Sequence, residues 1–340
     1  MENQKMENIL ITGANGEVGH GLIPKLSKLG WGKAIALDQN VLDEALKPFI
    51  AEFIQGSILQ ESHIASVLTK HKVSTIFHLA AILSTGAEKH PQIAQEINAQ
   101  GTALALEAAN AVAQKEKRII KFIFPSTIAV YGIPDLETKE KVGKIKEELL
   151  NNPITMYGIN KLYGEMLGKY YSNNYKLLDG KGNSHIDFRC VRFPGIISAL
   201  TLPTGGTSDY APEMIHSVAK GQGYESYVRP DTKIPFMVMP DAIAALIQLT
   251  EAARDTLTRN VYNVSGFSLT AKEIEELLIK VFTNASVKYV PDPNRQKIVD
   301  SWPQDLNDSY ARKDWGWKPE FDIERAFSDY LIPEITNLYK

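Results

Sequence analysis

The sequence of 340 residues has one cysteine, no long apolar run and almost no excess charge. A single cysteine, Cys190, cannot form an internal disulfide and argues against a zinc site built from several thiolates, so a reducing compartment is expected. Cys190 lies in the apolar run FRCVRF, which predicts a buried strand residue and not a nucleophile. The net charge of −3 gives no reason to expect nucleic acid or an anionic membrane as a partner.

The sequence also lacks membrane and targeting signals. No apolar stretch approaches the ~20 residues that span a bilayer. The first residues, MENQKMEN, are polar and have neither the apolar core of a signal peptide nor an Arg-rich transit pattern. These absences predict a soluble, cytoplasmic protein without a membrane partner, and the chain is long enough for two domains that share a cleft.

Short apolar runs alternate with helical patterns along the first 195 residues. Near-continuous apolar strands that alternate with helices predict a parallel sheet covered on both faces, with right-handed crossovers. Strands are expected at 8–13, 33–38, 74–81, 120–127 and 186–193. Helices are expected at 19–30, 61–71, 91–114 and around Tyr157.

After Gly195 the chain becomes rich in Pro, Gly and Thr and reads as a loop, PGIISALTLPTGGTSDYAPE. Further helices are expected in EMIHSVAKG, in MPDAIAALIQLTEAA and at 270–282, where Thr270 and Glu273 match a capping box. The predicted fold class is α/β, a Rossmann-type doubly wound parallel sheet with a small C-terminal α/β substrate domain. The expected division is 6–195 plus about 236–251 for the sheet domain, and 196–235 plus 252–340 for the second domain.

The turn ITGANGEVGH places Gly13, Gly16 and Gly19 between a strand and a helix. Glycines let the backbone approach a pyrophosphate, and the N–H groups and dipole of the helix N-terminus attract that anion. Asp38 ends the second strand and can accept hydrogen bonds from both adenosine ribose hydroxyls, whereas it would repel a 2′-phosphate. The two residues after Asp38 offer no cation, so the pattern predicts NAD and not NADP.

The stretch TMYGINKLYGE places Tyr157 and Lys161 four residues apart, on one face of a helix. Alone, this spacing also occurs by chance on solvated helices. Thr127 ends the strand 120–127, so with a nicotinamide nearby three polar groups converge. Lys161 and the positive nicotinamide ring would lower the pKa of Tyr157 from its usual ~10 and make it a general base. Lys161 would also hold the nicotinamide ribose, Thr127 would steady the substrate oxygen, and no metal is needed.

These features resemble the extended short-chain dehydrogenase/reductase family, the group that includes nucleotide-sugar epimerases and dehydratases. The resemblance covers almost the whole chain and rests on GxxGxxG, HLAA (78–81), PSTIAVYG, YxxxK, RFPG (192–195) and ARKDWGWKP (311–319). It implies that Ala80 and Ala81 line the cofactor and that Pro194 packs near the nicotinamide. Ser57 stands where an acid would bind the adenine amine more strongly. The expected cofactor residues are Gly13, Asn15, Gly16, Glu17, Val18, Gly19, Asp38, Gln39, Ser57, Ile58, Leu79, Ala80, Ala81, Asn98, Tyr157, Lys161 and Pro194.

Three stretches, LSTGAEKHP, the loop after Gly195 and RPDTKIPFMVMPDA, look like the short-chain type of L-threonine 3-dehydrogenases. The pattern PGGGTTDYA of that group is PTGGTSDYA here, so Thr204 and Ser208 depart from it. The resemblance implies oxidation of L-threonine to L-2-amino-3-oxobutanoate with NAD⁺, in a homodimer that pairs through the helices at 91–114 and 153–172. The expected substrate residues are Ser84, Thr127, Tyr157, Gly206, Thr207 and Trp302.

Several alternatives stay open. A nucleotide-sugar epimerase or dehydratase shares the fold and the Tyr–Lys pair, and Arg229 and Arg295 offer cations for its diphosphate. A non-catalytic NAD sensor that binds a protein partner is a further alternative, although such proteins usually lose the Tyr–Lys pair. The Gly-Gly-Thr loop also fits a plain turn, and Trp302 also fits a core aromatic. The segment 172–185 is expected to be a surface loop of unassigned role.

Overall fold

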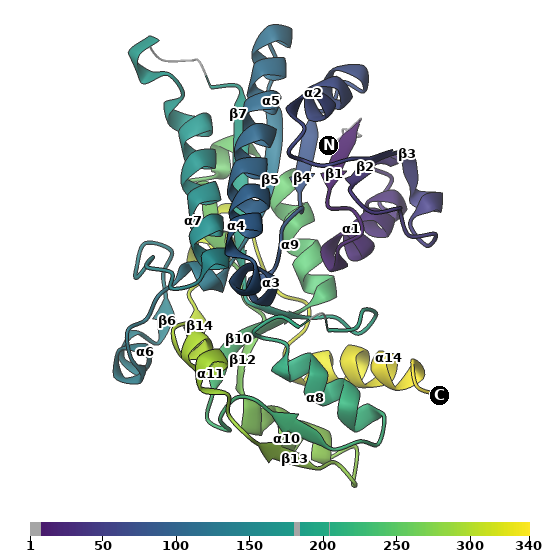
Figure 1. Cartoon of the computed structure of the whole chain (residues 1–340), viewed down its shortest axis with the longest axis vertical. Coiled ribbons are helices and arrows are strands. Elements are labelled where there is room, and N and C mark those ends of the chain that lie inside the picture. The colour runs from purple at the N-terminus through teal and green to yellow at the C-terminus, as the bar shows by residue number, and fades with distance from the viewer. Residues whose placement is uncertain (1–7, 180–183, 204) are drawn as a thin grey trace.

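A seven-stranded parallel sheet dominates the computed structural model, which describes residues 8–179, 184–203 and 205–340 (Figure 1). Thr204 and residues 180–183 of the expected surface loop lie outside the described residues. The strand order is β3-β2-β1-β4-β5-β7-β11, and it reverses between β1 and β4, where sheets of this kind bind ligands. The strands are β1 (Ile9–Thr12), β2 (Ala34–Asp38), β3 (Ile50–Gln55), β4 (Thr75–His78), β5 (Ile120–Thr127), β7 (Ile186–Phe193) and β11 (Val261–Asn263).

Helices cover both faces of this sheet, which confirms the Rossmann-type doubly wound fold. Because side chains alternate along a strand, Leu10 packs in the core under α2 and α5, whereas Ile9 and Ile11 pack in the core under α1 and α9. The helices on one face are α2 (Glu61–Lys70), α4 (Pro91–Ala94), α5 (Gly101–Glu116) and α7 (Met156–Lys169), with π-helical turns at Gln95–Gln100 and Tyr170–Asn174. Those on the other face are α1 (Glu17–Lys28), α9 (Met239–Glu251) and α12 (Ser309–Trp315).

A smaller group of elements continues from the carboxyl end of β7, where β8 begins two residues after Phe193 (Figure 1). Its three-stranded sheet has the order β12-β10-β8, and Thr270 and Glu273 form the predicted capping box of α10. Its strands are β8 (Gly195–Ile197), β9 (Tyr224–Ser226), β10 (Lys233–Val238), β12 (Phe267–Thr270) and β13 (Val287–Tyr289). Its helices are α8 (Tyr210–Ala219), α10 (Ala271–Ile279), α11 (Pro293–Asp300), α13 (Ile323–Arg325) and α14 (Ile332–Asn337).

The division into two domains stays a prediction. The structure does place β11 in the large sheet, paired with β7, although the expected second domain includes the residues of β11. It also shows a short strand, β8, at the start of the stretch that was expected to be a loop. The remaining elements are α3 (Ser84–Lys89), α6 (Leu136–Val142) and the paired short strands β6 (Lys144–Ile145) and β14 (Asp305–Leu306).

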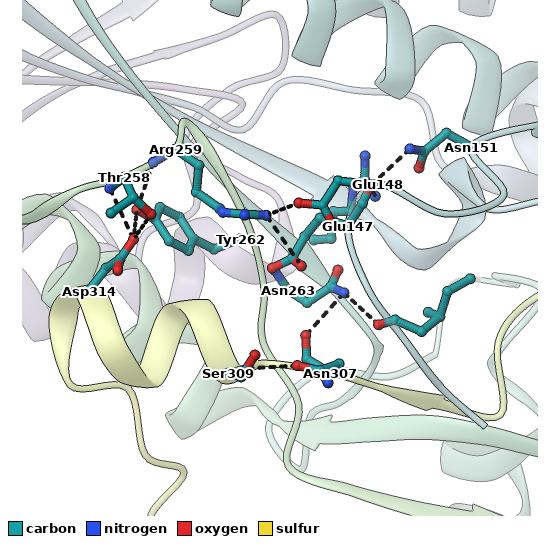
Figure 2. Close-up of polar contacts among 12 residues, drawn as sticks. Glu147, Glu148, Asn151, Thr258, Arg259, Tyr262, Asn263, Asn307, Ser309 and Asp314 are labelled. Atoms are coloured by element: carbon teal, nitrogen blue, oxygen red, sulfur yellow. Dashed lines mark hydrogen bonds and ion pairs between the residues drawn. The ribbon is translucent and has the colours of Figure 1, made fainter. Parts of the chain in front are cut away.

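Polar contacts around Asn263 on β11 tie the chain after α6 to the large sheet (Figure 2). The Asn263 N–H donates to the Glu147 carboxylate at 2.9 Å, and its side-chain amide donates to the Ile145 carbonyl at 3.1 Å. Arg259, close to β11, forms ion pairs with Glu147 and Glu148 at 3.5 and 2.6 Å. The segment 145–148 is therefore held against the sheet end that carries the carboxyl termini of β5 and β7.

Candidate active site

Two cavities adjoin at the carboxyl ends of the parallel strands and share the lining residues Gly16, Leu79 and Ala81. One reaches Asp38. The other reaches Tyr157 and Lys161. Because they share lining residues, the two cavities form one long groove across the point where the strand order reverses, which suits an elongated dinucleotide.

The expected cofactor residues line this groove almost completely. The lining residues among them are Gly13, Asn15, Gly16, Glu17, Val18, Gly19, Asp38, Gln39, Ser57, Ile58, Leu79, Ala80, Ala81, Tyr157, Lys161 and Pro194. Asn98 is the exception, since its side-chain amide accepts from the Ile82 N–H at 2.7 Å and donates to the Ile82 carbonyl at 2.9 Å. Asn98 thus fixes the backbone of Ile82, which lines the groove, and its expected contact with the cofactor stays a prediction.

The turn after β1 has the shape that a pyrophosphate requires. Gly13 has a φ of +69°, and a Cβ there would lie 2.6 Å from the Ala80 backbone, so only glycine fits. Gly16 is the N-cap of α1 and has no side chain that could accept hydrogen bonds from the first N–H groups of the helix. Glu17 and Val18, the first residues of α1, line the groove, so this end of the helix can attract an anion there.

The Asp38 carboxylate is fixed at the end of β2 by two backbone donors. It accepts from the Asn15 N–H and from the Asn40 N–H, each at 3.0 Å, and its residue is 7 % exposed. The side chain of Asn15 in turn donates to the Val41 carbonyl at 3.0 Å and accepts from the Asp43 N–H at 2.9 Å. A carboxylate has about four acceptor positions, so these contacts leave Asp38 able to accept from ribose hydroxyls.

Helix α7 turns its small and functional residues toward the sheet. Its N-cap, Thr155, accepts a 3.1 Å hydrogen bond from the Gly158 N–H. Tyr157, Lys161 and Gly168 follow at spacings of one and two helical turns and share a face. A Cβ at Gly168 would lie 2.2 Å from the Phe188 ring, so the glycine lets α7 lie close to the sheet and brings its polar residues to the groove.

Lys161 is 5 % exposed, and its ammonium donates a 2.8 Å hydrogen bond to the Pro125 carbonyl on β5. The Nζ atom lies 4.6 Å from the centroid of the Phe124 ring and 5.9 Å from that of Tyr157. Burial lowers the pKa of Lys161 to about 8, although the Cys190 and Glu165 side chains oppose this decrease. Lys161 is therefore mostly cationic at neutral pH.

In the chain alone, burial raises the pKa of the Tyr157 phenol above its usual value, and a hydrogen bond with the Thr127 side chain opposes this only in part. The expected lowering, by Lys161 together with a nicotinamide ring, stays a prediction. Thr127 itself accepts a 3.1 Å hydrogen bond from the Ala129 N–H. The structure brings Thr127, Tyr157 and Lys161 to one cavity, as expected, but the groups of the chain alone do not make Tyr157 acidic.

Most of the remaining expected substrate residues line the same cavity. Ser84, Gly206 and Trp302 line it. Thr207 lies behind Ser84, because its N–H and its hydroxyl both donate to the Ser84 hydroxyl oxygen, each at 3.1 Å. Trp302 is 4 % exposed and also packs in the hydrophobic core, so both expectations for this residue describe its position.

Three groups at the site were not assigned from the sequence. Asp209 lines the cavity and stands in the quoted PTGGTSDYA motif, which was a usable signal. Ser126 also lines it and donates to Glu165 at 2.6 Å; it precedes Thr127, which was a second signal. The third group is the Pro125 carbonyl that accepts from Lys161. No sequence signal marks it, because every residue has a backbone carbonyl.

The structure gives two further results at the level of the chain. Within the described residues, no group of three or more His, Cys, Asp or Glu side chains is placed to hold a metal ion. In the same part of the chain, no helix combines the length and the apolar character that crossing a membrane requires. Cys190 is fully buried in β7, as its apolar surroundings predict.

Comparisons with known proteins agree with this geometry. The family described as NAD dependent epimerase/dehydratase family matches residues 9–265. The mitochondrial L-threonine 3-dehydrogenase of Bos taurus is 34% identical over 337 residues, which are 96% of this chain and 82% of the bovine protein. An uncharacterised epimerase/dehydratase of Staphylococcus haemolyticus is 35% identical over 322 residues, 94% of each chain.

A solved structure of L-threonine dehydrogenase from Clostridium difficile superposes with a TM-score of 0.86 at 34% identity, over 98% of this chain and 99% of that one. The chain thus has similar proteins over nearly its whole length, and the residues that line the groove fit a nicotinamide dinucleotide. By sequence, fold and site, the chain belongs to the NAD-dependent epimerase/dehydratase family.

Proposed function

We propose that this protein is an NAD-dependent L-threonine 3-dehydrogenase, which oxidises the 3-hydroxyl of L-threonine to L-2-amino-3-oxobutanoate. The observation that carries the proposal is the lining of one cavity. Tyr157 and Lys161 share it with Ser84, whose hydroxyl offers a small polar group to a small hydroxy acid. Relatives that cover nearly the whole chain and bear this activity in their names support the same substrate.

In the proposed mechanism, Tyr157 acts as its phenolate and accepts the proton of the 3-hydroxyl, becoming a neutral phenol, while the Thr127 hydroxyl holds the same oxygen. Lys161 would hold the nicotinamide ribose, and its charge, together with that of the nicotinamide ring, would oppose the rise that burial causes in the pKa of the Tyr157 phenol. NAD⁺, when bound, supplies the ring that accepts the hydride. The buried Trp302 shields the reacting carbon from water. Asp38 selects NAD by accepting from the ribose hydroxyls.

The two arginines that could serve a nucleotide sugar are used within the chain. Arg229 donates to both oxygens of Asp300, at 2.9 and 3.0 Å, and pairs with Asp231 at 3.0 Å. Arg295 donates to the Gly206 carbonyl at 3.1 Å and lies 3.4 Å from the centroid of the Tyr227 ring. A nucleotide diphosphate would have to break these contacts to recruit either cation, which favours a small substrate.

We also propose that two copies pair through α7. The outward face of α7 and of the π-helical turn that follows it carries Ile159, Tyr163, Met166 and Tyr170, which are 41–58 % exposed and follow one another at helical spacing. An exposed apolar row on a helix is typical of a protein interface. A second copy, placing its own α7 against this row, would cover it.

The experiment that tests the function uses the purified full chain with NAD⁺ and L-threonine, followed by NADH absorbance at 340 nm. NADH formation that depends on L-threonine supports the proposal. Conversion of UDP-glucose without NADH release, and no reaction with L-threonine, would instead identify an epimerase. Absence of reaction with either compound would favour an NAD sensor.

A further inference from the structure

The turn 205–207 in the loop before α8 is held from its cavity side by two side chains. The N–H groups of Gly205 and Gly206 donate to one oxygen of Asp209, at 2.9 and 2.6 Å. Thr207 donates twice to the Ser84 hydroxyl oxygen, through its N–H and its hydroxyl. Ser84 therefore accepts two hydrogen bonds, and its only proton is left for another acceptor.

The same turn is held from the opposite side by Arg295 of α11 and by Tyr227. The Arg295 guanidinium donates to the Gly206 carbonyl at 3.1 Å. The Tyr227 hydroxyl lies 3.4 Å from the Gly206 carbonyl and 3.3 Å from the Thr207 carbonyl and donates to this pair. The guanidinium also stacks on the Tyr227 ring, 3.4 Å from its centroid, so each side chain holds the other in place.

Peptide geometry links the two sides. The Gly206–Thr207 peptide is trans, so the Gly206 carbonyl and the Thr207 N–H point in opposite directions. Holding the carbonyl on Arg295 therefore aims the N–H at Ser84. A cation on the carbonyl also polarises the peptide and strengthens the N–H as a donor.

We propose that Arg295 and Tyr227 are positioning residues that fix Thr207, and through it the Ser84 hydroxyl, so that Ser84 donates to the carboxylate of an α-amino acid substrate. This inference rests on the proposed function and adds the part of the substrate that the turn recognises. Arg295 acts through the backbone and not by binding the substrate. The ligand class is an amino acid with a free carboxylate, because a charged acceptor gains most from an oriented hydroxyl donor.

The test compares L-threonine with L-threoninol, in which a CH₂OH group replaces the carboxylate. In Arg295→Met, we expect the KM for L-threonine to rise about tenfold with little change in kcat. The KM for L-threoninol should rise about threefold or less. Arg295→Lys keeps the charge and should recover part of the loss. Tyr227→Phe keeps the ring and should raise the KM for L-threonine by a smaller factor. Lys297→Met removes an exposed cation from the same helix and should change nothing.

If the KM values for L-threonine and L-threoninol rise by the same factor in Arg295→Met, the inference is wrong, because an equal rise would indicate a general structural defect. Calorimetric titration of the NADH complex with L-threonine separates this inference from the proposed function. If the wild-type chain binds L-threonine without oxidising it, the proposed function is wrong. Weaker binding by Arg295→Met would still support the role of Arg295 as a positioning residue. If the wild-type chain neither binds nor oxidises L-threonine, both are wrong.

Discussion

The ammonium of Lys161 donates a 2.8 Å hydrogen bond to the carbonyl of Pro125, two residues before Thr127 on β5. This bond joins α7 to the end of the strand that carries Thr127, so Tyr157 and Thr127 face the same cavity. It also holds the Lys161 ammonium in a buried position, and this burial lowers the pKa of Lys161 to about 8. The position of Lys161 therefore serves both the architecture and the charge of the site.

The first prediction concerns the pH dependence of NAD⁺ binding. The pKa of Lys161 is lowered to about 8, so the side chain is cationic below that pH and loses its charge as the pH rises through it. We expect NAD⁺ affinity to fall between about pH 7 and about pH 9, because the neutral amine attracts the dinucleotide less. Fluorescence titration with NAD⁺ across this range measures the effect.

A matched pair of variants assigns this pH dependence. Lys161→Met should bind NAD⁺ weakly at every pH in the range, with no decrease above pH 8. Lys121 is half-buried, and burial lowers its pKa to about 8, but it lies at the start of β5 and donates to the Thr250 carbonyl. Lys121→Met should keep the pH dependence of NAD⁺ affinity. If Lys121→Met loses this dependence and Lys161→Met keeps it, Lys161 is not its source.

The second prediction concerns the base. Tyr157→Phe removes the proton acceptor and leaves the ring, so turnover with L-threonine should fall about 10²- to 10⁴-fold while NAD⁺ affinity stays near that of the wild type. Steady-state kinetics and NAD⁺ titration measure the two effects. Tyr163→Phe, on the exposed face of the same helix, is the control and should keep full turnover. Unchanged turnover in Tyr157→Phe would rule out the mechanism.

The fold was predictable where burial gives a continuous apolar signal. β5 and β7 are buried on both faces, and their observed bounds match the prediction. β3 was not predicted, because it is an edge strand with exposed positions, Ala51 and Gln55, and its apolar run is broken. β11 has only three residues, and its place beside β7 depends on a pairing over about 70 residues of chain.

The site was predictable where a motif lies in one stretch of sequence. GxxGxxG and YxxxK give the groove and its Tyr–Lys pair, because their spacing alone sets which residues face one another. The contact of Arg295 with Gly206 spans 89 residues and involves a backbone carbonyl, so no pattern announces it. In the chain without cofactor, burial raises the pKa of Tyr157, and that burial depends on packing that the sequence does not show. The lowering expected with a nicotinamide ring beside it stays a prediction.

The third prediction concerns cofactor choice. Asp38→Ser together with Gln39→Arg removes the carboxylate that repels a 2′-phosphate and adds a cation beside it. We expect NAD⁺ affinity to fall about 10- to 100-fold and NADP⁺ affinity to rise, measured by titration with both dinucleotides. Asp43→Asn changes an exposed carboxylate in the next loop, which contacts His20, and should leave the preference for NAD⁺ intact. Equal binding of NAD⁺ and NADP⁺ by the wild-type chain would contradict the role of Asp38.

The fourth prediction concerns the oligomeric state. Met166 is 58 % exposed in the middle of the apolar row on α7, and Ile93 is 49 % exposed on α4, which packs beside this helix. If a second copy covers the row, Met166→Glu places a charge in a desolvated interface, and the dimer should dissociate. Analytical ultracentrifugation of wild type and variant at matched concentrations measures the change.

Leu29→Glu provides the matched control for this change. Leu29 is also an exposed apolar residue, at 48 %, but it ends α1 on the opposite face of the sheet, so the same substitution there should leave the dimer unchanged. A wild-type chain that sediments as a monomer would reject pairing through α7, since the row would then be exposed in solution. Dissociation by both variants would indicate a general effect of added negative charge. Dissociation by Met166→Glu alone assigns the interface to α7, because only there does the new carboxylate lose its water.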